Sequence, residues 1–156
     1  LLGWAPSVGF EDGRRALLLV NTETGDVVQS VATNADISHM VAVAKDRGLA
    51  FVANIGSGSV TVIDLRAGAA FATTRQATFE AFNANPPDGV RLPRPFGASV
   101  AQDLEPEYIA TSHDSKTAFV TLQENSAMAV VNIRSATVTD VVGFLAFLGL
   151  ATLFLL

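Results

Sequence analysis

The feature of this sequence that most constrains its fold is an internal repeat. The segment 107–142 overlays the segment that begins at His39 without a gap, so that Asp114 falls on Asp46 and Ala118-Phe119-Val120 on Ala50-Phe51-Val52. A third, partial copy lies upstream, where the run from Leu19 to Gly25 overlays the run from Val62 to Gly68, 43 residues later. A period of about 40 to 45 residues is typical of four-stranded repeat units. The chain is therefore expected to contain two complete units and one partial unit.

Each unit consists of short apolar runs, rich in Val, Thr and aromatic residues, that are separated by short polar linkers. Such runs are typical of strands in an antiparallel meander. We expect strands at 16–20, 27–31, 40–44, 49–54, 60–65, 69–74, 108–111, 117–122, 127–133 and 137–142. The first two flank a turn in which Gly25 supplies a positive φ, and they are the outer hairpin of a unit whose inner strands are absent or lie in the first 13 residues. The predicted fold class is all-β, with β-propeller-like four-stranded antiparallel blades forming a partial propeller.

The repeats divide the chain into five segments. They are a partial first blade over 1–38, a complete blade over 39–74, an inserted Pro-rich loop and lead-in over 75–105, a complete blade over 106–142, and an apolar tail over 143–156. The insertion accounts for about 25 extra residues between Asp64 and Asn132, and its prolines favour an irregular loop. Such a loop either lies on a face that binds a ligand or is a tolerated surface insertion.

Composition narrows the class of protein. With 49% apolar and 16% charged residues the chain is globular, and without cysteine it has neither disulfides nor thiolate metal sites. The ten Lys and Arg residues are scattered along a chain of net charge -5, so we expect no nucleic-acid partner. The start carries no basic segment typical of an intact signal peptide. The uncharged tail over 143–156 is shorter than a membrane span, and membrane contact, a short helix over the open side and an artefactual end remain its alternatives.

Two family resemblances rest on the repeat units themselves. The segments 46–54 and 58–64 resemble the YVTN-type β-propeller repeat, with Phe51-Val52-Ala53-Asn54 where that motif reads Tyr-Val-Thr-Asn. The segments 97–109, 116–125 and 129–133 are similar to the bacterial choice-of-anchor I domain, and this similarity covers about 71–142. Domains of that family are secreted or surface-attached, which implies an extracytoplasmic location. They are also several times longer, so more propeller would be expected where this chain has its apolar tail.

Two polar clusters are candidate sites. Asp103, Glu105 and Glu107 alternate, and on an extended segment they would point to one side and bind a divalent cation such as Ca2+. The alternative is a solvated loop. The run Gln123, Glu124 and Asn125 is the candidate ligand-binding loop, and its alternative is a plain β-turn.

No complete catalytic motif accompanies these clusters. The sequence has no G-x-S-x-G elbow, no phosphate-binding loop of the P-loop type and no histidine pair at metal-ligand spacing, so His39 and His113 are expected to be turn residues. A binding or scaffold module is therefore the favoured function, and a lactonase, esterase or phosphatase with a metal-assisted site near the propeller opening is the alternative. Two and a half blades would leave apolar faces exposed at both ends, so we expect a homo-oligomer.

Overall fold

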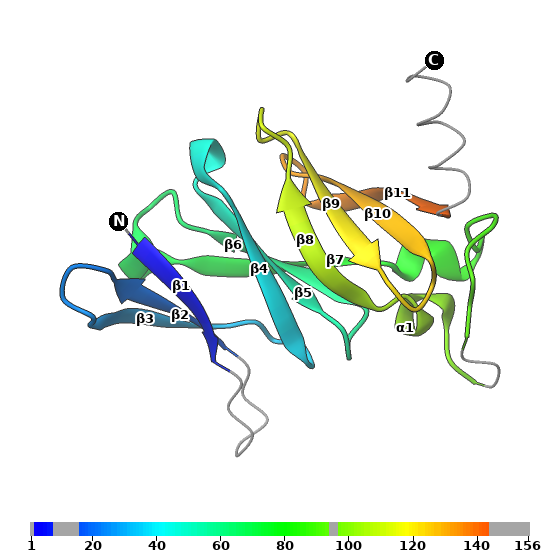
Figure 1. The fold of residues 1–156 in the computed structure, drawn as a ribbon, viewed down its shortest axis with the longest axis horizontal. Coiled ribbons are helices and arrows are strands. Elements are labelled where there is room, and N and C mark those ends of the chain that lie inside the picture. The colour runs from blue at the N-terminus through cyan, green and yellow to red at the C-terminus, as the bar shows by residue number, and fades with distance from the viewer. Residues whose placement is uncertain (1, 8–15, 94–96, 144–156) are drawn as a thin grey trace.

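The structure is a computed structural model that describes residues 2–7, 16–93 and 97–143, and within them the fold is three antiparallel sheets standing side by side (Figure 1). Blade 1 has the strand order β1-β2-β3, blade 2 the order β4-β5-β6-β7, and blade 3 the order β8-β9-β10-β11. Each blade is a meander in which neighbours in sequence are neighbours in the sheet. This arrangement confirms the predicted all-β, propeller-like fold class.

The strands lie close to where the sequence pattern placed them. Their bounds are β1 Leu2–Ser7, β2 Ala16–Asn21, β3 Val27–Ala32, β4 Ser38–Ala44, β5 Leu49–Asn54, β6 Ser59–Asp64, β7 Thr73–Thr78, β8 Pro106–Thr111, β9 Thr117–Leu122, β10 Ala127–Asn132 and β11 Thr137–Gly143. Short 3-10 helices lie at η1 Lys45–Arg47, η2 Ala69–Phe71 and η3 Glu80–Asn83, and one α-helical turn at α1 Val100–Asp103. The predicted short helix in the tail lies outside the described residues.

One predicted strand is wrong. The sequence places the outer strand of blade 2 at 69–74, but Ala69–Phe71 forms the 3-10 turn η2 and the strand β7 runs from Thr73 to Thr78. Gly68, with φ of 100°, precedes this turn and redirects the chain. The strand β7 pairs with β6 without a register shift, from Asp64 opposite Thr73 to Ser59 opposite Thr78. The segment inserted between the two complete blades therefore begins after Thr78.

Three equivalent residues close the same kind of turn in the three blades. Asn21, Asp64 and Asn132 are the last residues of β2, β6 and β10. In each, a side-chain oxygen accepts a hydrogen bond from the backbone N–H two residues later, at 2.9, 3.0 and 3.0 Å respectively. This local pattern is the Asx turn, which Asn and Asp favour for this reason. The sequence repeat is therefore also a structural repeat.

Contacts between blades join positions that are equivalent in the repeat. Across blades 2 and 3, the side chain of Arg47 donates a hydrogen bond to the carbonyl oxygen of Ser115 at 3.3 Å. The hydroxyl of Thr111 donates to the carbonyl oxygen of Val43 at 3.5 Å. Both pairs are separated by 68 residues, the offset of the two complete copies. The inner strands β4 and β8 run side by side (Figure 1). Successive blades are thus stacked in register, as a propeller requires.

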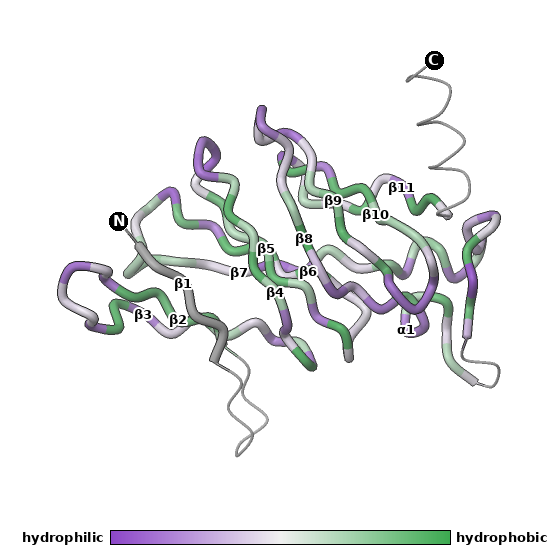
Figure 2. The backbone as a smooth tube through the Cα atoms, in the orientation of Figure 1, coloured by the Kyte–Doolittle hydropathy of each residue, from purple (hydrophilic) through white to green (hydrophobic). Residues whose placement is uncertain are grey.

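The two faces of blade 2 are both buried, each by a different neighbour. Along β5 all six residues are buried, with Ala50 and Val52 in the core shared with blade 1 and Leu49 and Phe51 in the core shared with blade 3. Alternation along a strand sends successive side chains to opposite faces, so a strand between two sheets is apolar throughout. Figure 2 shows this pattern, with hydrophobic colour along the strands and hydrophilic colour in the connecting turns.

Part of the inserted segment belongs to the core rather than to a surface loop. Phe79 is fully buried in the core between blades 2 and 3, and its ring lies 6.4 Å from that of Phe82 in η3. The side chain of Asn83 accepts a hydrogen bond from the backbone N–H of Ala101 at 2.9 Å, which ties η3 to α1. The beginning of the inserted segment, at η3, therefore packs against its end, at α1.

Candidate functional site

The three carboxylates of the predicted metal site, Asp103, Glu105 and Glu107, do not lie on one continuous strand. In the described part of the chain, no group of three or more His, Asp or Glu side chains could hold a metal ion. Asp103 is buried at the end of α1, whereas Glu107 lies within β8, whose first residue is Pro106. The segment is therefore not a single extended strand, and the alternation expected of Asp103, Glu105 and Glu107 does not apply. The described residues therefore lend the metal-assisted hydrolase no support, and it stays a prediction.

The predicted ligand-binding run is divided by the structure. Gln123 and Glu124 are exposed in the turn between β9 and β10, but Asn125 is fully buried. The side-chain amide of Asn125 donates to the carbonyl oxygens of Arg91 and Asp103, both at 2.9 Å, and its oxygen accepts from the backbone N–H of Glu105 at 3.2 Å. Asn125 therefore fastens the inserted segment to blade 3. A ligand-binding role for the two exposed neighbours stays a prediction.

The two histidines lie apart from one another on the surface. The ring of His39 lies edge-on to that of Tyr108, with 5.8 Å between the ring centroids, and its Nδ1 lies 3.4 Å from the carbonyl oxygen of Glu107. His113 is exposed in the turn between β8 and β9. His39 thus helps to join the inner strands of blades 2 and 3.

Apolar side chains are exposed or half-buried on the outward side of blade 3. We call this side the end face, and its side chains come from all four strands: Tyr108, Phe119, Thr121, Met128, Val130, Val142 and, opposite Val130, the charged Asp140. Part of it is hollowed into a pocket of about 380 Å³, which Gln123 also lines. The repeat offers a direct comparison, because Phe119 is 40% exposed while its equivalent in blade 2, Phe51, is fully buried against blade 3. The end face is therefore a blade-packing surface without a covering blade among the described residues.

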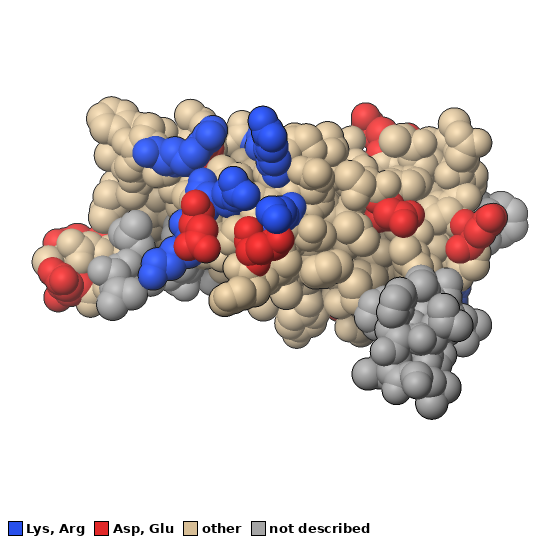
Figure 3. All heavy atoms as spheres, turned by 90° about the horizontal axis from the view of Figure 1, so that it is seen from above, with Lys and Arg blue, Asp and Glu red and all other residues tan. Residues whose placement is uncertain are grey.

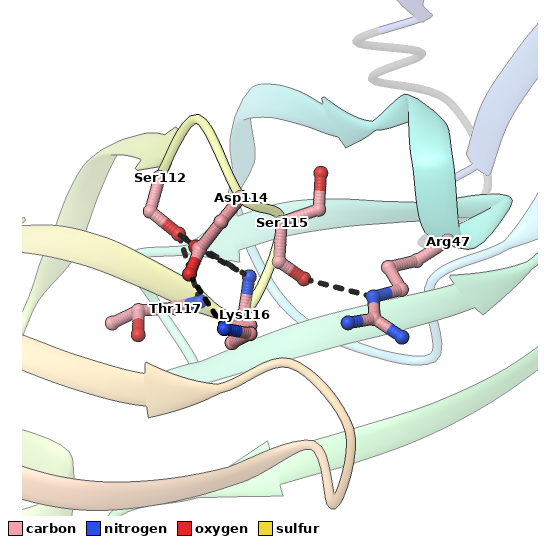
Figure 4. Close-up of polar contacts among 6 residues, drawn as sticks. All are labelled: Arg47, Ser112, Asp114, Ser115, Lys116 and Thr117. Atoms are coloured by element: carbon pink, nitrogen blue, oxygen red, sulfur yellow. Dashed lines mark hydrogen bonds and ion pairs between the residues drawn. The ribbon is translucent and has the colours of Figure 1, made fainter.

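Two aspartates pair with cations in turns of blades 2 and 3. Asp64 is the last residue of β6, and Asp114 lies in the turn between β8 and β9. Asp64 accepts hydrogen bonds from the guanidinium group of Arg66, and this lowers the pKa of Asp64 to about 2. The pKa of Asp114 is also lowered to about 2, first by a hydrogen bond from the hydroxyl of Ser112 and then by Lys116, whose Nζ lies 3.2 Å away (Figure 4). Both carboxylates are therefore ionised at neutral pH and pair with their cations at the surface.

Membrane contact through the apolar tail is not tested by the structure. The residues of that tail after Gly143 lie outside the described part of the chain. Within the described part, no helix combines the length and the apolar character needed to cross a membrane.

Solved structures with a similar fold are much longer than this chain. The hydrazine synthase of Kuenenia stuttgartiensis superposes with a TM-score of 0.57 at 13% identity, covering 85% of this chain and 36% of that one. A protein from Lactobacillus plantarum gives a TM-score of 0.41 at 18% identity, covering 90% of this chain and 52% of that one. The first of these similarities supports the fold alone. The chain thus spans about a third to a half of the structures it matches.

Sequence comparison identifies the family. A search of curated proteins finds no match. The family model described as the choice-of-anchor I domain matches residues 10–149, which include all of blades 2 and 3 and the segment between them. The match extends well beyond the segments on which the resemblance was recognised in the sequence. The chain belongs to the choice-of-anchor I domain family.

Proposed function

We propose that this chain is a non-enzymatic binding or scaffold module that completes its stack of blades by pairing with a second copy of itself. The observation that carries the proposal is the contrast between Phe51 and Phe119, which occupy the same position in successive blades but are buried and 40% exposed, respectively. Completing the burial of a partly exposed Phe stabilises an interface by about 1 kcal/mol. The neighbouring apolar side chains of the end face add to this gain.

The surface best suited to cover the end face is the free side of blade 1. Val20 is the equivalent of Ile63, which is fully buried between blades 1 and 2, yet Val20 is only partly buried and the neighbouring Val27 is exposed. The free side of blade 1 therefore offers the same kind of apolar surface that blade 2 meets on blade 3, where Val131 is the equivalent of Ile63. Contacts of this head-to-tail kind close into a ring when the rotation allows it.

The number of blades favours a dimer. Two copies, each with three sheets, would bring six blades together, and closed propellers have about four to eight. Such a dimer has two identical interfaces, so every substitution on the end face acts twice. The innermost strand of blade 1 is not among the described strands, and in a closed ring the inner edge of that blade would face the central channel.

The experiment is light scattering coupled to size-exclusion chromatography at several concentrations. The wild-type chain should elute as a dimer, whereas Phe119→Glu should be monomeric, because a carboxylate buried in two interfaces weakens association by about a hundredfold or more. Phe71→Glu is the matched control, since Phe71 is 71% exposed in η2, away from the end face. It should leave the dimer intact.

Two outcomes would contradict the proposal. A wild-type chain that stays monomeric at about 0.1 mM would show that the second copy does not cover these faces. An unchanged dimer in Phe119→Glu would place the contact elsewhere. Circular dichroism of both variants establishes that each remains folded, as expected for substitutions at positions that are already exposed.

A further inference from the structure

Cations that are scattered in the sequence are gathered by the fold into one groove between blades 2 and 3. The groove has a volume of about 570 Å³, and Arg47, Arg66, Arg75, Lys116 and Arg134 line it. These are five of the seven Lys and Arg residues in the described part of the chain. In the view of Figure 3, Lys and Arg side chains gather left of the middle of the molecule, with Asp and Glu side chains among them. Basic residues that are far apart in the sequence therefore share one surface in the fold.

The repeat explains why the cations meet. Arg66 follows β6 and Arg134 follows β10 at the same position of their blades, each two residues after an Asx-turn residue. Arg75 projects from β7 opposite Val62, on the side of blade 2 that packs against blade 3. Lys116 comes from the turn between β8 and β9, and Arg47 reaches the same turn from η1 (Figure 4).

The positive charge of the groove is only partly compensated. Arg66 is paired with Asp64, Lys116 with Asp114, and the Nε of Arg47 donates to a backbone carbonyl. In contrast, no hydrogen bond from the guanidinium group of Arg75 or Arg134 to another described residue is found, although Arg75 lies close enough to Asp64 to help lower the pKa of that carboxylate. Among the described residues that line the groove there is no Asp or Glu. Five cations thus share the charge of two aspartates in a groove between two sheets, and the guanidinium donors of Arg75 and Arg134 can reach a ligand there.

We propose that this groove binds a compact ligand that carries two or more phosphate or carboxylate groups. Guanidinium groups donate paired, parallel hydrogen bonds that match the geometry of both oxyanions. Cations stand on both sides of the groove, Arg75 from blade 2 and Arg134 from blade 3, so a ligand with separated anionic groups would bridge them. The volume exceeds the space that one phosphate or carboxylate fills, which favours a ligand with several such groups over a single inorganic ion.

The test is a calorimetric titration of the wild-type chain with inorganic pyrophosphate and, in a separate arm, with citrate. The two arms distinguish phosphate from carboxylate recognition. Each should bind with a dissociation constant below about 1 mM at low ionic strength, and affinity should fall as salt is added. The double variant Arg75→Gln/Arg134→Gln should bind at least about tenfold more weakly, because it removes charge-assisted hydrogen bonds.

Arg91→Gln is the matched control, because it removes one positive charge from the inserted segment outside the groove and leaves the backbone contacts of Arg91 with Asn125 in place. It should bind like the wild type. Absence of binding by both probes would overturn the proposal. It would also be overturned if Arg91→Gln weakened binding as much as the double variant, or if a single-stranded oligonucleotide bound more tightly than either probe.

Discussion

The closest approach between the inserted segment and a blade occurs at Gly58, in the turn between β5 and β6. A Cβ atom added there would lie 2.0 Å from the carbonyl oxygen of Ala101 in α1 and 3.1 Å from that of Leu104. The φ of Gly58 is also positive, at 53°. Its equivalent in blade 3, Ser126, has nearly the same φ of 49° but is exposed, so a side chain is accommodated there. The close packing of α1 therefore requires glycine at position 58.

We expect Gly58→Ala to destabilise the fold by about 2 to 4 kcal/mol. About 1 kcal/mol of this comes from placing a Cβ in the left-handed region. The remainder, about 1 to 3 kcal/mol, is the cost of displacing a backbone carbonyl in a packed core. The displaced atom belongs to a helical turn fixed by a capping box between Ser99 and Gln102, so it has no free rotation that would relieve the overlap.

Urea unfolding monitored by circular dichroism measures this cost, with Gly25→Ala as the matched control. Gly25 has a φ of 79°, and no atom lies within 4 Å of its added Cβ, so this variant carries the conformational term alone, about 1 kcal/mol. The difference between the two variants isolates the steric contribution of α1. Equal losses of stability in the two variants would refute the inferred contact between the β5–β6 turn and α1.

Two further predictions concern the hydrogen bonds of Asn125 to the inserted segment and the ionised carboxylates of Asp64 and Asp114. Asn125→Ala should lower the free energy of unfolding by about 2 to 3 kcal/mol, because three hydrogen bonds made by a fully buried side chain are lost. It should also speed proteolysis of the inserted segment. Stability equal to that of the wild type would contradict the role of Asn125 in fastening this segment to blade 3. The pKa values of Asp64 and Asp114 are lowered in the folded state, so the stabilisation from these carboxylates is present above the unfolded value of 3.8 and is lost as pH falls toward about 2. The urea midpoint should therefore drop between about pH 4 and 2, and the drop should be smaller in Asp64→Asn. An equally steep drop in Asp64→Asn would contradict the contribution of Asp64.

Much of the fold is predictable because local pattern and repeat spacing agree. The strands Leu49–Asn54 and Thr117–Leu122 have the bounds that their apolar runs indicate. The error at 69–74 arises because a run of alanines carries no clear period, whereas pairing with β6 selects Thr73–Thr78. Pairing is a property of the neighbouring strand, and the sequence of a weak strand does not contain it.

The candidate sites were less predictable, for a related reason. The carboxylates from Asp103 to Glu107 are close in sequence, but α1 and β8 give them different backbone directions. Asn125 is a buried side chain that makes hydrogen bonds with three backbone groups of the inserted segment. The basic groove could not be predicted from the spacing of its residues, because they are up to 87 positions apart in the sequence, from Arg47 to Arg134. The equivalence of Arg66 and Arg134 in the repeat is the one signal that could have indicated it.

The sequence by itself determined that this chain forms antiparallel blades, because a recurrent pattern of alternating apolar residues and Asx turns specifies the same local geometry wherever it occurs. Only the tertiary structure decided that Phe51 is buried and Phe119 exposed, and that arginines from two blades share one groove. Burial and charge density depend on which surface lies opposite, and identical sequence motifs meet different neighbours at the middle and at the end of a stack.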